Sequence, residues 1–220
     1  MILFLVIINP LIYLSQNEEY RGNAWNSILV RNKVSDNYNL VFDIGYRSFD
    51  EYIKRTRQGL IRVLIERKIS NKHSFGIGIA YFESISSNFN SFKKEIRPFV
   101  QYQFVNKNDK SNFSLRFRNE LRNYIEANDL VNRARIQLSY EYEIGKYLFP
   151  RISFEQFVSF KKNKLINEQR FGISNTFTIS EVINFNFFYI LQFQSNIKIN
   201  NCVIPQNILG LQLILNMENK

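Results

Sequence analysis

The sequence has little of what disulfide-bonded, metal-binding and helical proteins depend on. Cys202 is the only cysteine of the 220 residues and His73 the only histidine, which excludes an intrachain disulfide and a metal site built from several of either residue. Eight glycines and four prolines are too few for a collagen-like or flexible low-complexity chain. Alanine, the best helix former, occurs only four times, so the composition argues against a helical fold.

Aromatic residues, in contrast, are abundant, with 21 phenylalanines and 12 tyrosines. Aromatic and β-branched side chains fit the pleated surface of a strand, so the composition predicts an all-β fold. A hydrophobic fraction of 45 % is too high for a disordered chain. The length fits one domain of the larger all-β kind.

The N-terminus reads MILFLVIINPLIYLSQ and carries no charge. This run is too short for a transmembrane helix, which needs about 20 residues, and Pro10 would interrupt such a helix. Its length suits a secretory signal, with Ser15 as the small residue before the cleavage site. We predict a signal peptide over residues 1–15 and a single barrel domain over residues 16–220. Because no basic residue precedes the apolar run, a buried first strand is the alternative.

Apolar and polar residues alternate with a period of two along most of the remaining chain, as in strands with two different faces. In NFSLRFRNELR, for example, Phe113, Leu115 and Phe117 share one face, and the intervening polar residues share the other. Eleven such segments are expected, near residues 23–33, 38–48, 53–67, 73–84, 95–105, 112–122, 129–143, 147–159, 166–178, 182–194 and 206–217.

The length of these segments favours strands that cross a membrane. Strands of soluble proteins average about 5–6 residues, whereas a tilted strand needs about 9–11 to cross a bilayer. The links alternate between short ones and longer ones such as SISSNFNSFKK and SNIKINNCVIP, as between the periplasmic turns and outer loops of outer-membrane barrels. We therefore predict an antiparallel up-and-down transmembrane β-barrel. Because bacterial barrels of one chain have an even strand number, about 12 strands are expected, with an extra crossing through residues 18–22, or 10 as the alternative.

Several stretches resemble the outer-membrane barrel family catalogued as domain of unknown function 2490, found largely in Bacteroidota. The resemblance covers roughly residues 20–217 and rests on AWNSILVRNKVSDNYNLVFDIGYR, LVNRARIQLSYEYEI, FPRISFEQFVSF with NEQRFG, and NILGLQLIL. It implies a signal peptide and a β-barrel in the outer membrane of a Gram-negative bacterium. The family supplies no activity, cofactor or functional residue.

The polar face of the strands is expected to line the interior of the barrel. An arginine or lysine that faces lipid at the middle of a bilayer costs about 2–4 kcal/mol, so the apolar face must be the outer one. The predicted lumen-lining residues are Arg47, Arg62, Glu66, Arg97, Arg116, Arg118, Glu120, Arg133, Arg135, Glu141, Arg151, Glu155 and Arg170. Two interpretations remain open, a packed structural polar core and a narrow pore whose arginines attract anions.

Within this set we expect a cross-strand ladder of ion pairs, because opposite charges on neighbouring strands can brace the wall. The expected members of the ladder are Arg116, Arg118, Glu120, Arg133, Arg135 and Glu141.

Basic residues also gather in links that we place outside the membrane. These are Lys93, Lys94, Lys161, Lys162 and Lys164. They are either solvated or paired with lipopolysaccharide phosphates, so the expected partners are outer-membrane lipid and lipopolysaccharide. The net charge of +10 does not predict nucleic-acid binding, because the arginines are spread over many segments and form no single stripe.

Enzyme chemistry has little support in the sequence. His73 and Ser74 are neighbours on a predicted strand and point to opposite faces, so they cannot form a nucleophile–base pair. We predict no catalytic, cofactor-binding or metal-binding residues. The predicted function is an integral outer-membrane barrel, either structural or a narrow pore. The alternatives are a soluble β-barrel that binds a ligand in an apolar interior and an outer-membrane hydrolase.

Overall fold

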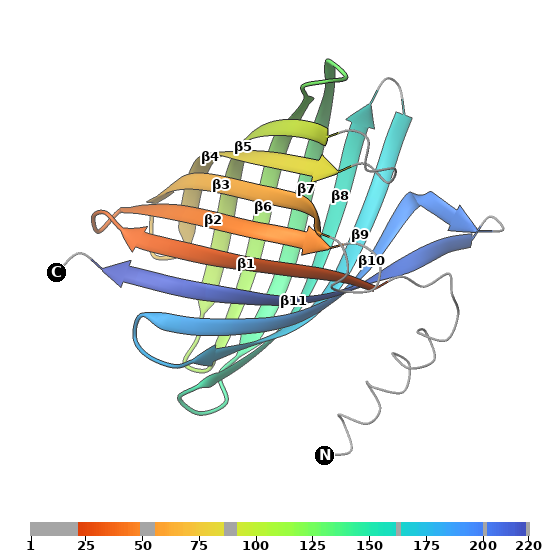
Figure 1. Ribbon diagram of the computed structural model, residues 1–220. Coiled ribbons are helices and arrows are strands. Elements are labelled where there is room, and N and C mark those ends of the chain that lie inside the picture. Colours follow the sequence, from red (N-terminus) through yellow and green to blue (C-terminus); the bar gives the residue numbers. More distant parts are fainter. Residues whose placement is uncertain (1–21, 49–55, 86–91, 162–163, 200–201, 219–220) are drawn as a thin grey trace.

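The computed structural model describes residues 22–48, 56–85, 92–161, 164–199 and 202–218, which form a single β-sheet and its turns (Figure 1). Among these residues no helix is long and apolar enough to span a membrane. Each strand overlaps one of the segments that the alternating pattern predicts. The strands are β1 (Gly22–Lys33), β2 (Tyr38–Ser48), β3 (Thr56–Lys68), β4 (His73–Ile85), β5 (Phe92–Lys107), β6 (Ser111–Tyr124), β7 (Asp129–Tyr142), β8 (Leu148–Lys161), β9 (Lys164–Thr178), β10 (Ile183–Ile199) and β11 (Cys202–Glu218).

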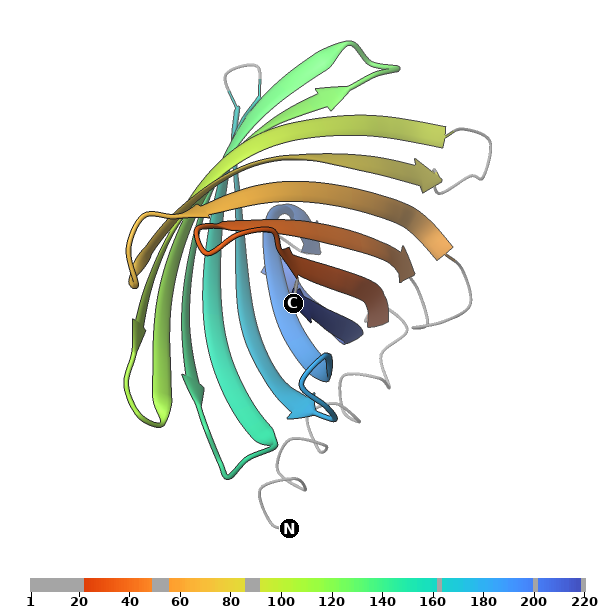
Figure 2. The same cartoon turned by 90° about the vertical axis from the view of Figure 1, so that its left-hand side faces the viewer.

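The sheet closes on itself, which confirms the predicted barrel (Figures 1 and 2). Successive strands pair in antiparallel fashion, as in an up-and-down barrel. The closing pair of β1 and β11 is parallel, with a register from Gly22↔Asn207 to Lys33↔Glu218. The described residues thus contain eleven strands, close to the expected 12 or 10, because a parallel closing pair removes the need for an even number. The extra crossing predicted through residues 18–22 lies outside the described residues, except for Gly22 at the start of β1.

The two ends of the barrel differ in how the strands are joined. At one end, here named the turn end, the connections are residues 34–37, 69–72, 108–110, 143–147 and 179–182. Backbone hydrogen bonds close them, as from the Ile69 N–H to the His73 carbonyl at 2.8 Å. In the turn before β2, Lys33 Nζ lies 3.0 Å from Asp36 Oδ1, and its hydrogen bond and charge lower the pKa of this exposed carboxyl.

The opposite end is named the loop end. Its connections are residues 49–55, 86–91, 125–128, 162–163 and 200–201. The structure corrects the long link expected between the last two strands, because β10 and β11 continue as a hairpin that projects at the loop end (Figure 1). The register shifts between Phe193 and Lys198 and pairing resumes at Lys198↔Val203, which marks a β-bulge or other irregularity there.

The outer face of the wall is apolar. Ile77 and Ile152 are each 60 % exposed, although isoleucine is normally buried in a soluble protein. The same exposed set includes Ile28, Phe42, Ile44, Ile61, Ile65, Ile79, Val100, Phe117, Ile136, Leu138, Phe171, Phe187 and Leu209. The facing is therefore the reverse of a soluble domain.

The inner face is polar on most strands, but not on all of them. Inward side chains of β2 to β5 form an apolar cluster against which Leu29 packs. The cluster consists of Val41, Leu60, Leu64, Ala80, Phe82 and Phe99. The alternating pattern predicted polar residues on the inner face. The structure shows that, along β2 to β5, hydrophobic residues also pack there.

Gly78 makes the apolar cluster possible, because Phe99 lies directly across from it on the neighbouring strand. A Cβ atom at Gly78 would lie 2.3 Å from Phe99 Cζ and 2.6 Å from the Val63 carbonyl oxygen. Either contact forces the neighbour to move, so only glycine fits.

We predict that Gly78→Ala lowers the free energy of unfolding by about 1–3 kcal/mol, the usual range for overpacking. The matched control is Gly59→Ala, because a Cβ there would have nothing within 4 Å. Urea unfolding of the barrel in detergent, followed by tryptophan fluorescence, measures both variants. Equal midpoints for the two would contradict the packing described for Phe99.

Candidate functional site

The charged interior is the candidate functional site. All thirteen predicted lumen-lining residues occupy inward positions in the strand registers, and several are buried, including Arg97, Arg118, Glu120, Arg133 and Glu155. Whether they line a conducting lumen stays a prediction.

Glu120 on β6 is the centre of one cluster of ion pairs. Its side chain, only 3 % exposed as a residue, accepts hydrogen bonds from two arginines of the neighbouring β7. Arg133 donates from Nε at 2.9 Å and also from Nη2, and Arg135 donates from Nη1 at 2.5 Å. Arg118 lies farther away, with Nη1 at 3.8 Å from Oε1. One carboxylate thus holds several guanidiniums in the interior.

Glu155 on β8 is the centre of a second cluster, linked to the first through Arg135. The Nη2 atom of Arg135 donates to Glu155 Oε1 at 2.7 Å. Arg116 reaches the same oxygen at 3.2 Å, and Arg170 lies 3.9 Å from Oε2. A continuous ladder of charges therefore runs along the inner face from β6 to β9.

The expected ladder was wrong in one member, Glu141. It lies near the turn end, opposite Arg151 in the register, and Glu155 takes the place expected for it. The Arg151 guanidinium donates to Ser139 Oγ at 2.6 Å, and Ser139 shares a 2.6 Å hydrogen bond with Ser114. Alternation shows that both acids face inward, but it does not show which one lies level with the arginines.

Two acids that belong to the network were missed. Glu95 binds Arg97 at 2.5 Å and Arg122 at 2.6 Å, and Glu168 binds Arg170 at 2.5 Å. A signal was present in the sequence, since Glu95 stands two residues before Arg97 and Glu168 two before Arg170. Residues two apart on a strand share a face, so the acid and the arginine of each pair lie on the same face of their strand.

Aromatic rings separate the guanidiniums of the interior. Phe157, only 1 % exposed, lies beneath three of them, at 5.2 Å from Arg133, 4.6 Å from Arg135 and 4.4 Å from Arg170. The centre of the Phe82 ring lies 3.6 Å from the guanidinium carbon of Arg97. Cation–π contacts of this kind favour a cation over a ring face while excluding water. The interior is therefore densely filled on the loop-end side of its middle.

Two inward arginines of β6 differ in their exposure to solvent. The side chain of Arg116 is 24 % exposed, against 4 % for Arg118, which is two residues nearer the loop end. Glu66 accepts hydrogen bonds from Ser74 Oγ at 3.0 Å and Asn39 Nδ2 at 3.5 Å. Arg116 is therefore more accessible to solvent than Arg118.

The predicted outer basic residues lie in strands more than in loops. Lys93 and Lys94 are exposed residues of β5, because this strand begins earlier than expected. The Lys94 backbone N–H donates to Glu126 Oε2 at 2.8 Å. Lys161 ends β8 and pairs in register with Lys164 at the start of β9, and Lys162 lies outside the described residues.

His73 and Ser74 point to opposite faces, as expected for neighbours on a strand. Nδ1 of His73 lies 2.6 Å from the Tyr102 hydroxyl, whereas Ser74 donates to the inward Glu66. In the described part of the chain no group of three histidine, cysteine or acidic side chains could hold a metal ion.

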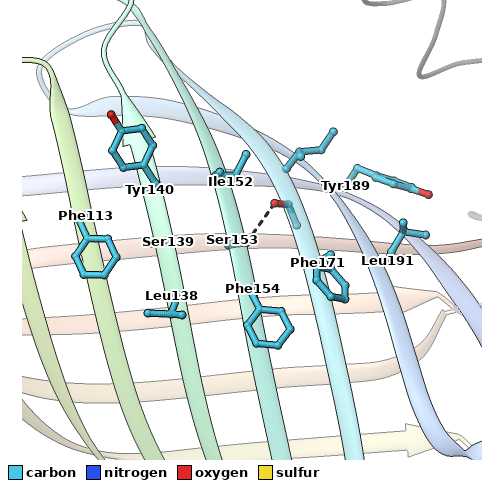
Figure 3. A pocket seen from close by; sticks show the side chains of 12 residues that line it. Phe113, Leu138, Ser139, Tyr140, Ile152, Ser153, Phe154, Phe171, Tyr189 and Leu191 are labelled. Carbon is cyan, nitrogen blue, oxygen red and sulfur yellow. Dashed lines mark hydrogen bonds between the residues drawn. The ribbon is translucent and has the colours of Figure 1, made fainter.

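A second feature is an apolar groove on the outer face, across β6 to β10, with a volume of about 530 Å³ (Figure 3). Two rows of outward side chains form its walls, and Ser139, Ser153 and Gly172 lie between the rows. One row contains Leu138, Phe154, Phe171 and Leu191, and the other Phe113, Tyr140, Ile152, Ile173 and Tyr189. With hydrophobic walls and few polar atoms, it offers a surface for hydrocarbon.

The closed sheet, the apolar outer face and the charged interior define a porin-like β-barrel. The sequence profile of the family described as "Protein of unknown function (DUF2490)" matches residues 22–202, which is most of the chain. The chain therefore belongs to this family, which confirms the resemblance in the sequence. No curated protein matches it significantly.

Solved structures share the fold at low sequence identity. One is titled "NanC porin structure in rhombohedral crystal form", with a TM-score of 0.51 and 14 % identity over 85 % of this chain and 93 % of that chain. Another is the outer-membrane expressed OmpT of Vibrio cholerae, with a TM-score of 0.45 and 5 % identity over 77 % of this chain and 61 % of that chain. The first likeness supports the barrel fold.

We predict that Glu120→Gln lowers the free energy of unfolding by about 3–5 kcal/mol, because it leaves buried arginines without their carboxylate. Glu181→Gln, in an exposed turn, is the matched control and should change stability little. Heat-dependent migration of the folded barrel on gels, together with urea unfolding, gives both values. A neutral result for Glu120→Gln would mean that water, not the arginines, solvates this carboxylate.

Proposed function

We propose that this chain is an integral outer-membrane β-barrel of a Gram-negative bacterium that forms a narrow pore with a preference for anions. The observation that carries the proposal is the excess of guanidinium groups over carboxylates on the inner face. The inward arginines are Arg47, Arg62, Arg97, Arg116, Arg118, Arg122, Arg133, Arg135, Arg151 and Arg170. The inward acids on the same strands, β2 to β9, are fewer: Asp43, Glu66, Glu95, Glu120, Asp129, Glu141, Glu155 and Glu168.

The apolar outer face supports the membrane location. Large exposed hydrophobic surfaces on a folded protein mark contact with a membrane or another protein. Here the exposed residues are distributed over all sides of a closed wall, as a surrounding bilayer requires. The soluble ligand-binding alternative needs the opposite facing, with hydrophobic residues inside and charges outside.

The strand number supports a narrow passage. Barrels of about 8 strands are filled by their own side chains, and those of 16–18 strands enclose an aqueous channel. The eleven strands of the described residues lie between these cases, so the inward side chains decide the width. The packed rings and arginines near Phe157 would restrict the passage.

A sealed structural barrel is the second candidate, and the burial of the Glu120 and Glu155 clusters favours it. A hydrolase is not proposed. The only histidine of the chain, His73, lies on the outer face and shares a hydrogen bond with Tyr102, whereas the adjacent Ser74 faces inward.

Two further parts of the proposal concern export and lipid. We assign residues 1–15, outside the described residues, to an export signal. With the loop end on the outside, the exposed Lys93 and Lys94 of β5 would meet lipopolysaccharide phosphates.

Conductance of the purified barrel in a planar bilayer tests the pore. We expect small channels whose reversal potential in a potassium chloride gradient shows a preference for chloride. Arg151→Gln should reduce this preference, because Arg151 is an inward, partly exposed arginine of the turn-end half. Arg67→Gln, an exposed arginine next to Tyr38 on the outer face, is the matched control and should change nothing. A silent bilayer would support the sealed barrel, and cation preference would contradict the proposal.

Membrane insertion tests the location and the facing. Leu138→Arg or Phe187→Arg places a charge on the outer face, where it would cost about 2–4 kcal/mol at the middle of a bilayer, and should reduce recovery from the outer-membrane fraction. Gln137→Arg, next to Leu138 but inward, should be milder. Recovery of the unmodified protein in the soluble periplasm, or greater damage from Gln137→Arg, would contradict the proposal.

A further inference from the structure

Arg47 differs from most other arginines of the interior in its partners. It lies near the loop end of β2, and its Nη1 donates to the neutral side chain of Gln58 at 3.0 Å. Gln58 is itself held by a 2.8 Å hydrogen bond from its Nε2 to Ser84 Oγ. The guanidinium carbon of Arg47 lies 4.1 Å from the centre of the Trp25 ring and 5.7 Å from that of Phe82. The guanidinium is therefore positioned by neutral groups.

No carboxylate neutralises Arg47 among the residues that the structure describes. By contrast, Arg97, Arg133 and Arg170 each have an acid within ion-pair distance. The charged groups that act most strongly on Arg47 are like charges, those of Arg170, Arg97, Arg62 and Arg133. A partly buried cation without a counter-charge is costly, so this position favours an anion.

Trp25 supplies an unsatisfied donor next to this uncompensated cation. It pairs with Arg47 across β1 and β2, and its ring centre also lies 4.9 Å from the guanidinium carbon of Arg170. Its Nε1 atom is shielded from solvent and has no acceptor in the described part of the chain. A buried N–H group without an acceptor costs free energy, and native structures rarely leave one.

From these two donors we propose that Trp25 and Arg47 form a binding site for the carboxylate of a small organic acid. The free N–H groups of a guanidinium match two carboxylate oxygens, and the indole N–H adds a further donor. A single uncompensated cation suits a monovalent acid, because the neighbouring Arg170 and Arg97 already have acids of their own. This inference rests on the proposed anion preference and names the class of anion that the lumen would select.

Trp25 is the only tryptophan in the chain, so its fluorescence reports on the site directly. The folded barrel in detergent is titrated with sodium acetate at constant ionic strength, and with acetamide as a neutral molecule of similar shape. We expect a saturable change with acetate and none with acetamide. Arg47→Gln should weaken binding at least about tenfold, since that is the effect of losing a hydrogen bond to a charged group.

Two further variants keep the result interpretable. Arg67→Gln removes a cation from the outer face and should bind acetate as the unmodified barrel does. Arg47→Lys retains the charge without the fork of N–H groups, and should weaken binding severalfold even if Arg47→Gln does not fold. The proposal is overturned if acetate gives no saturable change, or if the Arg47 variants bind it unchanged.

The titration needs no ion flow, so it separates the site from the pore. A barrel that binds acetate but conducts no ions would retain the site and refute the pore. A barrel that conducts anions without saturable acetate binding would support the pore and refute the site.

Discussion

An open sheet leaves unpaired backbone N–H and C=O groups along both edges, and the closure of this barrel removes that problem by joining the first strand to the last. Successive strands alternate in direction. With the odd number of eleven among the described residues, the first and last strands run in the same direction, so β1 and β11 pair in parallel. Their register is continuous from Gly22↔Asn207 to Lys33↔Glu218. For a wall surrounded by lipid, where no water is present to bind free backbone groups, such closure is a requirement.

Closure also decides what the two faces of each strand can do. The outward side chains have no protein to pack against and are apolar, as contact with lipid would require, and the inward ones enclose a small shared space. In that space the arginines are held by carboxylates and by rings, with Arg135 joining the Glu120 and Glu155 clusters. Buried ion pairs add little net stability compared with hydrophobic packing, but removing one partner is costly. The network therefore keeps the arginines in place more than it stabilises the fold.

The interior is unequal in two directions. On the side of β2 to β5 a hydrophobic cluster packs beside the Asp43–Arg62 pair, and on the side of β5 to β9 the interior is mostly charged. Along the axis, the packed rings lie nearer the loop end and the more exposed Arg116 nearer the turn end. Arg47 and Trp25 lie at the loop end. An anion entering from that side would meet them before it reached Phe157 and the arginines packed on its ring.

The sequence by itself determined the barrel class and the approximate position of each strand, and it indicated which residues of a strand share a face. It could do so because alternation is a local property, visible wherever one face meets an apolar and the other a polar environment. Thus the shared face of Arg118 and Glu120 could be read directly from their spacing.

Only the tertiary structure decided which of these residues meet. The strand number and the parallel seam depend on how the sheet closes, which no single segment records. The choice of Glu155 over Glu141 depends on the stagger of neighbouring strands, because that stagger decides which inward residues lie at the same height. The inward rings of Phe82, Phe99 and Phe157 escaped prediction for a related reason, since a phenylalanine satisfies the pattern of an outer face equally well. The pairing of Trp25 with Arg47 and Arg170 required the curvature that brings β9 towards β1 and β2.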